Sequence, residues 1–368
     1  MFRKEEFLSL GLELVFIPDS YQVDDPDEYI IFDDNLYFTQ ELLKEFIVRS
    51  QKQRKSTTCA LKSGVTTLRT VIAAQEVKTS SSYIEYSLRY LPKEKFRGEY
   101  HPLVIDSDQV YTHIPMPGHI CENQRYLIPM TERFIIQINH WVNLWAANVI
   151  TLLAEGARLQ KASKIKLAIF ALKARSLDRW KILCQLNKIG RNCDIHPTAY
   201  IEGSTIGDDV TIGARVTIRE SVIGSGAFIG NGVVIEESVI GEKSTILTGH
   251  ILYSVLYPGT FTVAQMISAS LIGKDTFIGS DVVLTDFRLD GKNVLVVKDG
   301  AKIDTGNKLI GCCLGHGVYL GAGSIVAPGR AIPGGMRIAP ERERIVSSCN
   351  SDQNVPGFRL VKESVSKQ

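Results

Sequence analysis

The 368-residue sequence has no excess of either charge, since 42 Lys and Arg residues nearly cancel 40 Asp and Glu residues. No overall field would attract a polyanion, so a nucleic-acid partner is not expected. The seven cysteines are an odd number, are scattered, and never form a C-x-x-C pair. We therefore expect reduced thiols, and the sequence also lacks any spacing typical of metal ligands.

The N-terminus lacks the pattern of a secretion signal, because Glu5 and Glu6 stand where a basic region and an apolar run would be needed. The long uncharged segment 134–154 is interrupted by Gln137, His140 and three asparagines, which argues against a membrane span. These absences predict a cytoplasmic protein. The apolar content of 44% is sufficient for a large core, and the length suggests two or three domains.

Charge is distributed unevenly along the chain. Residues 1–50 contain twelve acidic and four basic residues, whereas residues 158–191 contain ten basic residues and only Asp178 as an acid. The basic stretch is interpreted either as a solvated face or as a docking surface for the acidic N-terminal segment. Because Leu, Ile, Phe and Trp180 interleave with the basic residues, peripheral contact with an anionic membrane through 158–191 is a further hypothesis.

The first half of the chain divides into two parts. Residues 1–130 alternate short apolar runs with turn signals and contain one helical run after Thr39, its expected N-cap, which predicts a mixed α/β domain. Residues 131–188 carry apolar side chains at spacings of three and four, as at Trp141, Trp145 and Val149. This spacing predicts a helical connector that is basic in its second half.

A repeat begins at Ile189 and extends to residue 339, followed by a polar tail over 340–368. Aliphatic residues recur at spacings of six, six and five, so that Ile189, Ile206, Ile223 and Ile240 are each seventeen residues apart. Such a period predicts a left-handed parallel β-helix of hexapeptide repeats, in which each coil has three short strands and the aliphatic side chains stack inside.

The period slips between Thr245 and Met266 and is lost again between Thr285 and Lys308, before regular spacing returns at Leu314. We expect loops that leave the prism at both places, where functional residues tend to lie. The tail is expected to cover the last open strand edge.

Four stretches of the repeat region share motifs with a known family: Thr248-Gly-His-Ile, Leu284-Thr-Asp-Phe-Arg-Leu-Asp-Gly-Lys, Asp304-Thr-Gly-Asn-Lys-Leu-Ile-Gly and Gly315-His-Gly-Val-Tyr-Leu-Gly-Ala-Gly. They resemble the acetyltransferase half of bifunctional sugar-1-phosphate nucleotidylyltransferase/acetyltransferases, in the hexapeptide-repeat superfamily. The resemblance implies a homotrimer that transfers an acetyl or acyl group from coenzyme A, or from an acyl carrier protein, to a sugar or amino-sugar acceptor, without a metal.

By the same resemblance, His250 matches the general base of the family. The alternative interpretation is that His250 is an ordinary turn residue. His316, between two glycines, is the second candidate base. Four charged residues lie between Thr285 and Lys308, where the period is lost: Asp286, Arg288, Asp290 and Lys292. They are candidates for binding the acceptor, or they are simply charged residues of a loop. The acyl donor is expected at Lys308, Gly323 and Arg330, where Arg330 is equally a solvated turn residue.

The sequence departs from the family at three points. Residues 1–60 contain no Gly-rich phosphate loop, so nucleotidylyl transfer is not expected and the N-terminal domain resembles a degenerate nucleotidyltransferase. Asp286 replaces an asparagine, and Gly306-Asn307-Lys308 replaces a doubly basic run. These departures favour the second hypothesis, a non-catalytic scaffolding or regulatory relative of sugar nucleotidylyltransferases.

Overall fold

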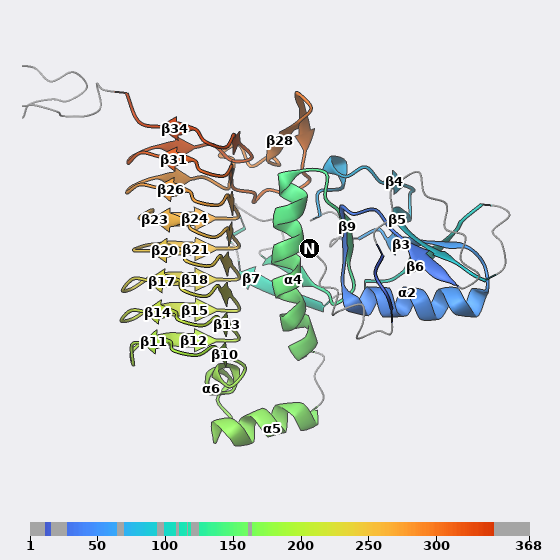
Figure 1. Cartoon of the computed structure of the whole chain (residues 1–368), viewed down its shortest axis with the longest axis horizontal. Coiled ribbons are helices and arrows are strands. Elements are labelled where there is room, and N and C mark those ends of the chain that lie inside the picture. The colour runs from blue at the N-terminus through green and yellow to red at the C-terminus, as the bar shows by residue number, and fades with distance from the viewer. Residues whose placement is uncertain are drawn as a thin grey trace, which may run out of the picture.

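The computed structural model describes residues 12–15, 28–64, 70–93, 99–107, 110–115, 117–118, 125–160 and 164–341. A mixed α/β domain is followed by helices and then by a parallel β-helix, which confirms the expected fold class (Figure 1). The acidic residues 24–27 and the tail residues 342–368 lie outside the described part of the chain, as do the expectations that concern them.

The N-terminal domain is built on strand β3 (Thr57–Lys62), which pairs antiparallel with β5 (Tyr83–Leu91) and parallel with β6 (His101–Ile105). Helix α2 (Gln40–Gln53) buries Leu42, Leu43 and Phe46 in the core of this domain. The remaining elements are β1 (Tyr29–Ile31), β2 (Leu36–Phe38), the 3-10 turn η1 (Ile72–Ala74), β4 (Lys78–Thr79), β7 (Val110–Pro115), β8 (Arg125–Met130) and β9 (Ile135–Gln137).

Thr39 is the N-cap of α2 by position, as expected, but its hydroxyl does not cap the helix. The Thr39 hydroxyl instead donates to the carbonyl of Phe134 and accepts from the Phe134 amide. Phe134 therefore belongs with the N-terminal domain rather than with the helical connector.

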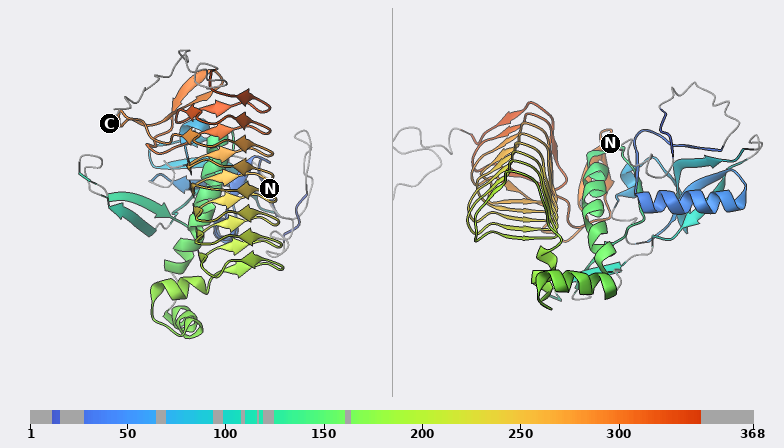
Figure 2. Two further views of the ribbon diagram at one scale, coloured as in Figure 1. Left: turned by 90° about the vertical axis from the view of Figure 1, so that its left-hand side faces the viewer. Right: turned by 60° about the horizontal axis from the view of Figure 1, so that its bottom comes forward.

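Strand β9 pairs antiparallel with β2, so the N-terminal domain extends to residue 137. The helices of the connector begin after it, at Trp141. Three helices follow: α4 (Trp141–Gln160), α5 (Lys164–Ala174) and α6 (Arg179–Cys184). Within the described ranges, no helix is long and apolar enough to cross a membrane. Figure 1 and the right-hand view of Figure 2 show α4 standing between the N-terminal domain and the β-helix.

Three parallel sheets form the β-helix, and each coil contributes one strand to each sheet. The first sheet contains β10 (Lys188–Ile189), β13 (Thr205–Ile206), β16 (Val222–Ile223), β19 (Val239–Ile240), β22 (Val255–Leu256), β25 (Leu271–Ile272), β30 (Cys313–Leu314) and β33 (Ala331–Ile332). The second contains β11 (Asp194–Ile195), β14 (Thr211–Ile212), β17 (Phe228–Ile229), β20 (Thr245–Ile246), β23 (Phe261–Thr262), β26 (Phe277–Ile278), β31 (Tyr319–Leu320) and β34 (Arg337–Ile338). The third contains β12 (Tyr200–Glu202), β15 (Thr217–Arg219), β18 (Val234–Glu236), β21 (His250–Leu252), β24 (Met266–Ser268), β27 (Val283–Leu284) and β32 (Ile325–Val326).

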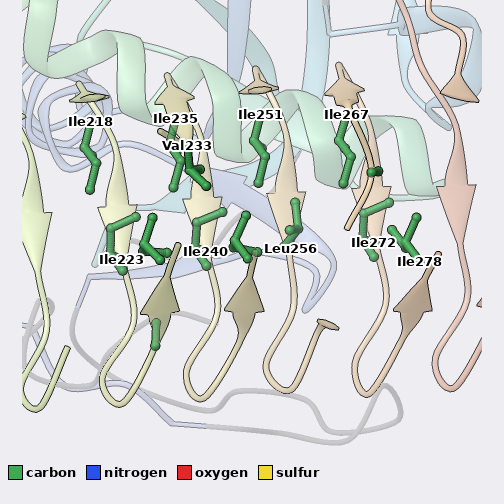
Figure 3. Packing of buried hydrophobic residues seen from close by; sticks show 14 of the residues in the cluster. Ile218, Ile223, Val233, Ile235, Ile240, Ile251, Leu256, Ile267, Ile272 and Ile278 are labelled. Carbon is green, nitrogen blue, oxygen red and sulfur yellow. The ribbon is translucent and has the colours of Figure 1, made fainter. Parts of the chain in front are cut away.

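The interior of the prism is a stack of aliphatic side chains, as the repeat predicts. Ile206, Ile223 and Ile240 are at most 2% exposed and lie in register on successive strands of the first sheet. Figure 3 shows that such rows from different sheets point toward one another. Each coil thus completes the burial of its neighbour, which is the main source of stability in a solenoid.

No loop leaves the prism between Thr245 and Met266, so that expectation was wrong. Val234 pairs with His250 and Thr245 pairs with Phe261, which means that these coils contain sixteen residues instead of seventeen. The missing residue comes from the turn between the second and third sheets. Gly249 has φ +103° in that turn, and a Cβ there would overlap the carbonyl oxygen of Ala264. A glycine makes the shorter turn feasible.

The second irregular stretch does leave the prism. Residues 285–309 connect β27 to β30 and form an antiparallel hairpin of β28 (Leu295–Lys298) and β29 (Ala301–Asp304), whose base is closed by a bridge between Phe287 and Leu309. The coils before and after this insertion remain neighbours, since Leu271 of β25 pairs directly with Cys313 of β30 in the first sheet.

The shortened turn predicts a strong effect of Gly249→Ala. The added methyl would combine left-handed backbone strain with overlap, so we expect the free energy of unfolding to fall by about 3 kcal/mol or more. Gly232→Ala is the matched control, because Gly232 has φ +71° and open space around it. Denaturant unfolding of both variants measures this effect. Equal decreases in the free energy of unfolding would contradict the proposed overlap.

Candidate functional site

His250 lies on the outer surface of the third sheet. It is the first residue of β21, a three-residue strand in which Ile251 points into the core, so His250 and Leu252 point outward. Its side chain is 38% exposed, and its Nε2 atom lies 3.0 Å from Glu236 Oε2. His250 therefore lies in a strand rather than in a turn.

The contact with Glu236 defines the roles of the two ring nitrogens. When a histidine Nε2 donates to a carboxylate oxygen, as this contact allows, the Nδ1 atom of the neutral ring is the one that carries the lone pair. A histidine oriented in this way by a carboxylate is the arrangement of a general base.

Glu236 also belongs to a charged column that crosses three coils of the third sheet. Arg219 Nη1 lies 3.0 Å from Glu236 Oε1, and Arg219 Nε lies 3.2 Å from Glu202 Oε1. The guanidinium also lies over the rings of Tyr200 and Trp180. The sequence analysis missed this column, although the seventeen-residue spacing of its acidic and basic residues was a signal that would have identified it.

Glu237 occupies the corner next to this column, with φ +41°. The pKa of Glu237 is raised from 4.5 to about 8, mainly by burial of the carboxyl and then by the nearby carboxylates of Glu220 and Glu236. Glu237 therefore carries a proton at neutral pH in the folded state.

His316 has a structural role in a turn between the first and second sheets. Its Nδ1 atom accepts the backbone N–H of Lys274, at 2.8 Å, and its ring packs near Tyr257. With Nδ1 occupied, the neutral ring carries its proton on Nε2 and has no lone pair left for a base. His196 accepts the amide of Thr198 through Nδ1 in a similar way. The structure does not bring His316 and His250 together.

The charges of the insertion mainly contact one another. Arg288 Nε donates to Asp290 Oδ1 at 2.9 Å, and this hydrogen bond holds the pKa of Asp290 at about 2. The same carboxylate accepts the backbone N–H of Lys292, while Asp286 accepts the amide of Ile310 through its backbone carbonyl. These contacts fit loop charges that shape the base of the insertion.

The residues expected to bind the acyl donor are spread over two corners of the prism. Arg330 lies between the third and first sheets and donates through Nη2 to the carbonyl of Leu295, at 3.0 Å, so it holds the hairpin rather than standing solvated. Lys308 is exposed on the insertion at the same corner. Gly323, with φ +73°, lies in a turn between the second and third sheets.

The adjacent thiols are not activated. Cys312 is buried and Cys313 packs against the core that includes α4, and burial raises the pKa of each thiol to about 12. A protonated thiol is a poor nucleophile. In the described part of the chain, no three His, Cys, Asp or Glu residues are grouped in a way that would hold a metal ion.

Residues 182–258, about a fifth of the chain, match the family model described as the GMPPB C-terminal domain. This segment is similar to that domain. No curated protein shows significant sequence similarity to the chain.

Solved structures that match include a hexapeptide transferase family protein from Anaplasma phagocytophilum, at 21% identity and a TM-score of 0.19, over 42% of this chain and 80% of that one. PerB from Caulobacter crescentus, solved with CoA and GDP-perosamine, matches at 18% identity and a TM-score of 0.22 over 42% of this chain. The acetyltransferase domain of PglB from Neisseria gonorrhoeae, solved with acetyl coenzyme A, matches at 18% identity and a TM-score of 0.14 over 40% of this chain. The matched region spans 55% of the PerB chain and 52% of the PglB chain.

The raised pKa of Glu237 predicts a stability that falls with rising pH. The folded state retains a proton that the unfolded state releases between pH 4.5 and about 8, so stability is highest below this window and is lost through it. Glu237→Gln cannot ionise. We expect it to be more stable than wild type by at least about 1 kcal/mol at pH 8.5 and to differ little at pH 5.

Thermal unfolding at several pH values measures this difference, with the exposed Glu242→Gln as the control. A wild type whose melting temperature follows that of Glu237→Gln at every pH would show that Glu237 is ionised at neutral pH.

Proposed function

We propose that the protein is a non-catalytic hexapeptide-repeat scaffold, a relative of sugar nucleotidylyltransferases in which the β-helix holds the N-terminal domain in a fixed position. The match of residues 182–258 supports the relationship, because GMPPB is a nucleotidyltransferase-family protein. The observation that carries the proposal is a hydrophobic core shared by the N-terminal domain, α4 and the first sheet.

The shared core joins three parts of the molecule that lie far apart in sequence. Val71 and Phe134 come from the N-terminal domain, Trp145 from α4 and Leu271 from the first sheet, and all four are buried. Trp145 also donates its indole N–H to the carbonyl of Tyr253, at 2.7 Å. Burial of this many large side chains at one junction makes independent movement of the two domains costly.

The insertion adds a second attachment. Lys298, on β28, donates through Nζ to the carbonyl of Ala74, at 3.2 Å, and to Glu76, at 3.0 Å. The His140 ring contacts the carbonyl of Val297 through Nε2 at 3.1 Å, and burial lowers the pKa of His140, which favours the neutral ring. The hairpin thus lies above the upper end of α4 and contacts the N-terminal domain (Figure 1).

Acyl transfer is the second candidate function, favoured by the oriented His250–Glu236 pair. The donor would be coenzyme A or an acyl carrier protein, and the acceptor a sugar or amino sugar. Three strand spacings of the third sheet, roughly 14 Å, separate β21 from β32, which precedes Arg330. A neighbouring prism in a homotrimer would have to supply donor contacts close to His250.

A thiol-release assay with acetyl-coenzyme A and a panel of amino sugars separates the two candidates. For a scaffold, we expect the wild type and His250→Ala to release thiol at the background rate, because His250 would then serve only in the contacts between coils. Acyl transfer requires instead that His250→Ala lower a measurable rate by about a hundredfold to ten-thousandfold. Glu242→Gln, on an exposed turn, controls for nonspecific effects of substitution.

The hairpin attachment predicts a local effect of Lys298→Met. Removing the ammonium leaves the Ala74 carbonyl without this donor, so we expect amide exchange of Ala74, at the end of η1, and of the following Gln75 to accelerate about five- to tenfold. Exchange in β16, in the middle of the prism, should not change. Hydrogen exchange followed by mass spectrometry measures both.

Lys302→Met is the matched control, because Lys302 is an exposed lysine on the other strand of the same hairpin. If both lysine variants accelerated exchange equally, the attachment through Lys298 would not fix the N-terminal domain.

A further inference from the structure

The end of the molecule beneath the first coil exposes several large apolar side chains. Helices α5 and α6 lie at this end, and Figures 1 and 2 show α5 projecting below the prism. The side chains of Ile169, Leu172 and Leu177 are 48%, 77% and 91% exposed, and Ile189 on the first coil is also exposed. Single exposed apolar residues are common, but a group from one short segment requires an explanation.

The exposure of Leu177 is fixed by an ordered turn and does not result from an unstructured helix end. Arg175 adopts φ +47°, its amide donates to the Leu172 carbonyl, and the Ser176 amide donates to the Ala171 carbonyl, which together close α5. Asp178 then caps α6 by accepting the Trp180 amide at 2.9 Å. The connection between the two helices therefore holds Leu177 outward.

The segment that contains α5 and α6 is rich in basic residues. Residues 158–191 contain ten basic residues, and their single acid, Asp178, is used in the cap of α6. Lys173, Arg175 and Lys181 are exposed beside the apolar side chains. A second copy of this surface would bring like charges together, whereas an anionic surface would neutralise them. Charge therefore favours an anionic partner over self-association.

Helix α6 is attached to the prism, so the orientation of this surface relative to the prism is defined. The Gly203 amide donates to the Leu183 carbonyl at 3.3 Å, and the Arg219 guanidinium lies 5.7 Å from the centre of the Trp180 ring. Apolar side chains among exposed cations on a fixed helical surface are the features of a segment that lies in the interface of a membrane. The apolar side chains would enter the headgroup region while the cations remain at the phosphates.

We propose that α5, α6 and the turn between them dock onto an anionic lipid surface. The proposal concerns peripheral attachment and is independent of the proposed function, because it depends neither on the core shared by the N-terminal domain, α4 and the first sheet nor on the insertion. It predicts that the full chain binds vesicles of phosphatidylcholine with phosphatidylserine, and that binding weakens with salt.

Co-sedimentation with vesicles containing phosphatidylserine, and with vesicles of phosphatidylcholine alone, tests the proposal at low and high salt. Lys173→Gln with Lys181→Gln should weaken binding roughly 30-fold at low salt, from about 1 kcal/mol for each cation. Leu172→Glu with Leu177→Glu should weaken it at least about tenfold. Leu289→Glu, at a fully exposed leucine on the insertion, is the control and should bind like wild type.

The absence of binding at low salt would overturn the proposal, as would equal binding to both vesicle compositions. Light scattering without lipid tests the competing explanation, which is that the surface binds a second copy of the chain. A concentration-dependent increase in mass that the Leu172→Glu, Leu177→Glu variant abolishes would show that the surface binds a second copy instead. Circular dichroism of each variant verifies that a loss of binding does not reflect unfolding.

Discussion

The stacking of each coil on the next is the constraint on which the rest of the molecule depends. Aliphatic side chains form the interior, and a column of buried serines runs along the corner between the third and first sheets. Each serine accepts the amide of the residue in the following coil, as Ser221 does from Ser238 at 3.1 Å and Ser254 does from Ser270 at 3.1 Å. Because these groups are buried, a coil shifted by one residue would leave them without partners and would turn its aliphatic residues outward.

This constraint explains why the coil length changes only in turns. The sixteen-residue coils keep the strands in register and remove one residue where Gly249 allows a tighter path. The long insertion likewise leaves the stack unchanged, since Cys312 continues the serine column by donating its amide to Ser270. Variation is restricted to corners and outer surfaces, so those are the places where the protein differs from a plain solenoid.

Much of this arrangement could be predicted from the sequence, because the repeat is local and regular. The period of seventeen predicts the fold, and the loss of period after Thr285 predicts the insertion. The slip after Thr245 was misinterpreted because a one-residue shortening and an excursion of the chain interrupt a pattern in the same way. Contacts such as Lys298 with Ala74 join residues 224 positions apart, and no local pattern indicates them. The role of the insertion therefore required the structure.

The candidate site likewise could be predicted only in part from the sequence. The resemblance identified His250, but its partner Glu236 follows only from the stacking of β18 beneath β21. Glu236 also contacts Arg219, since its Oε1 atom lies 3.0 Å from Arg219 Nη1. Here the carboxylate is shared along a column that begins at the buried Glu202, so the histidine extends a series of contacts between coils. The column accounts for the orientation of His250 without requiring catalysis, so this orientation is compatible with the scaffold that the shared hydrophobic core supports.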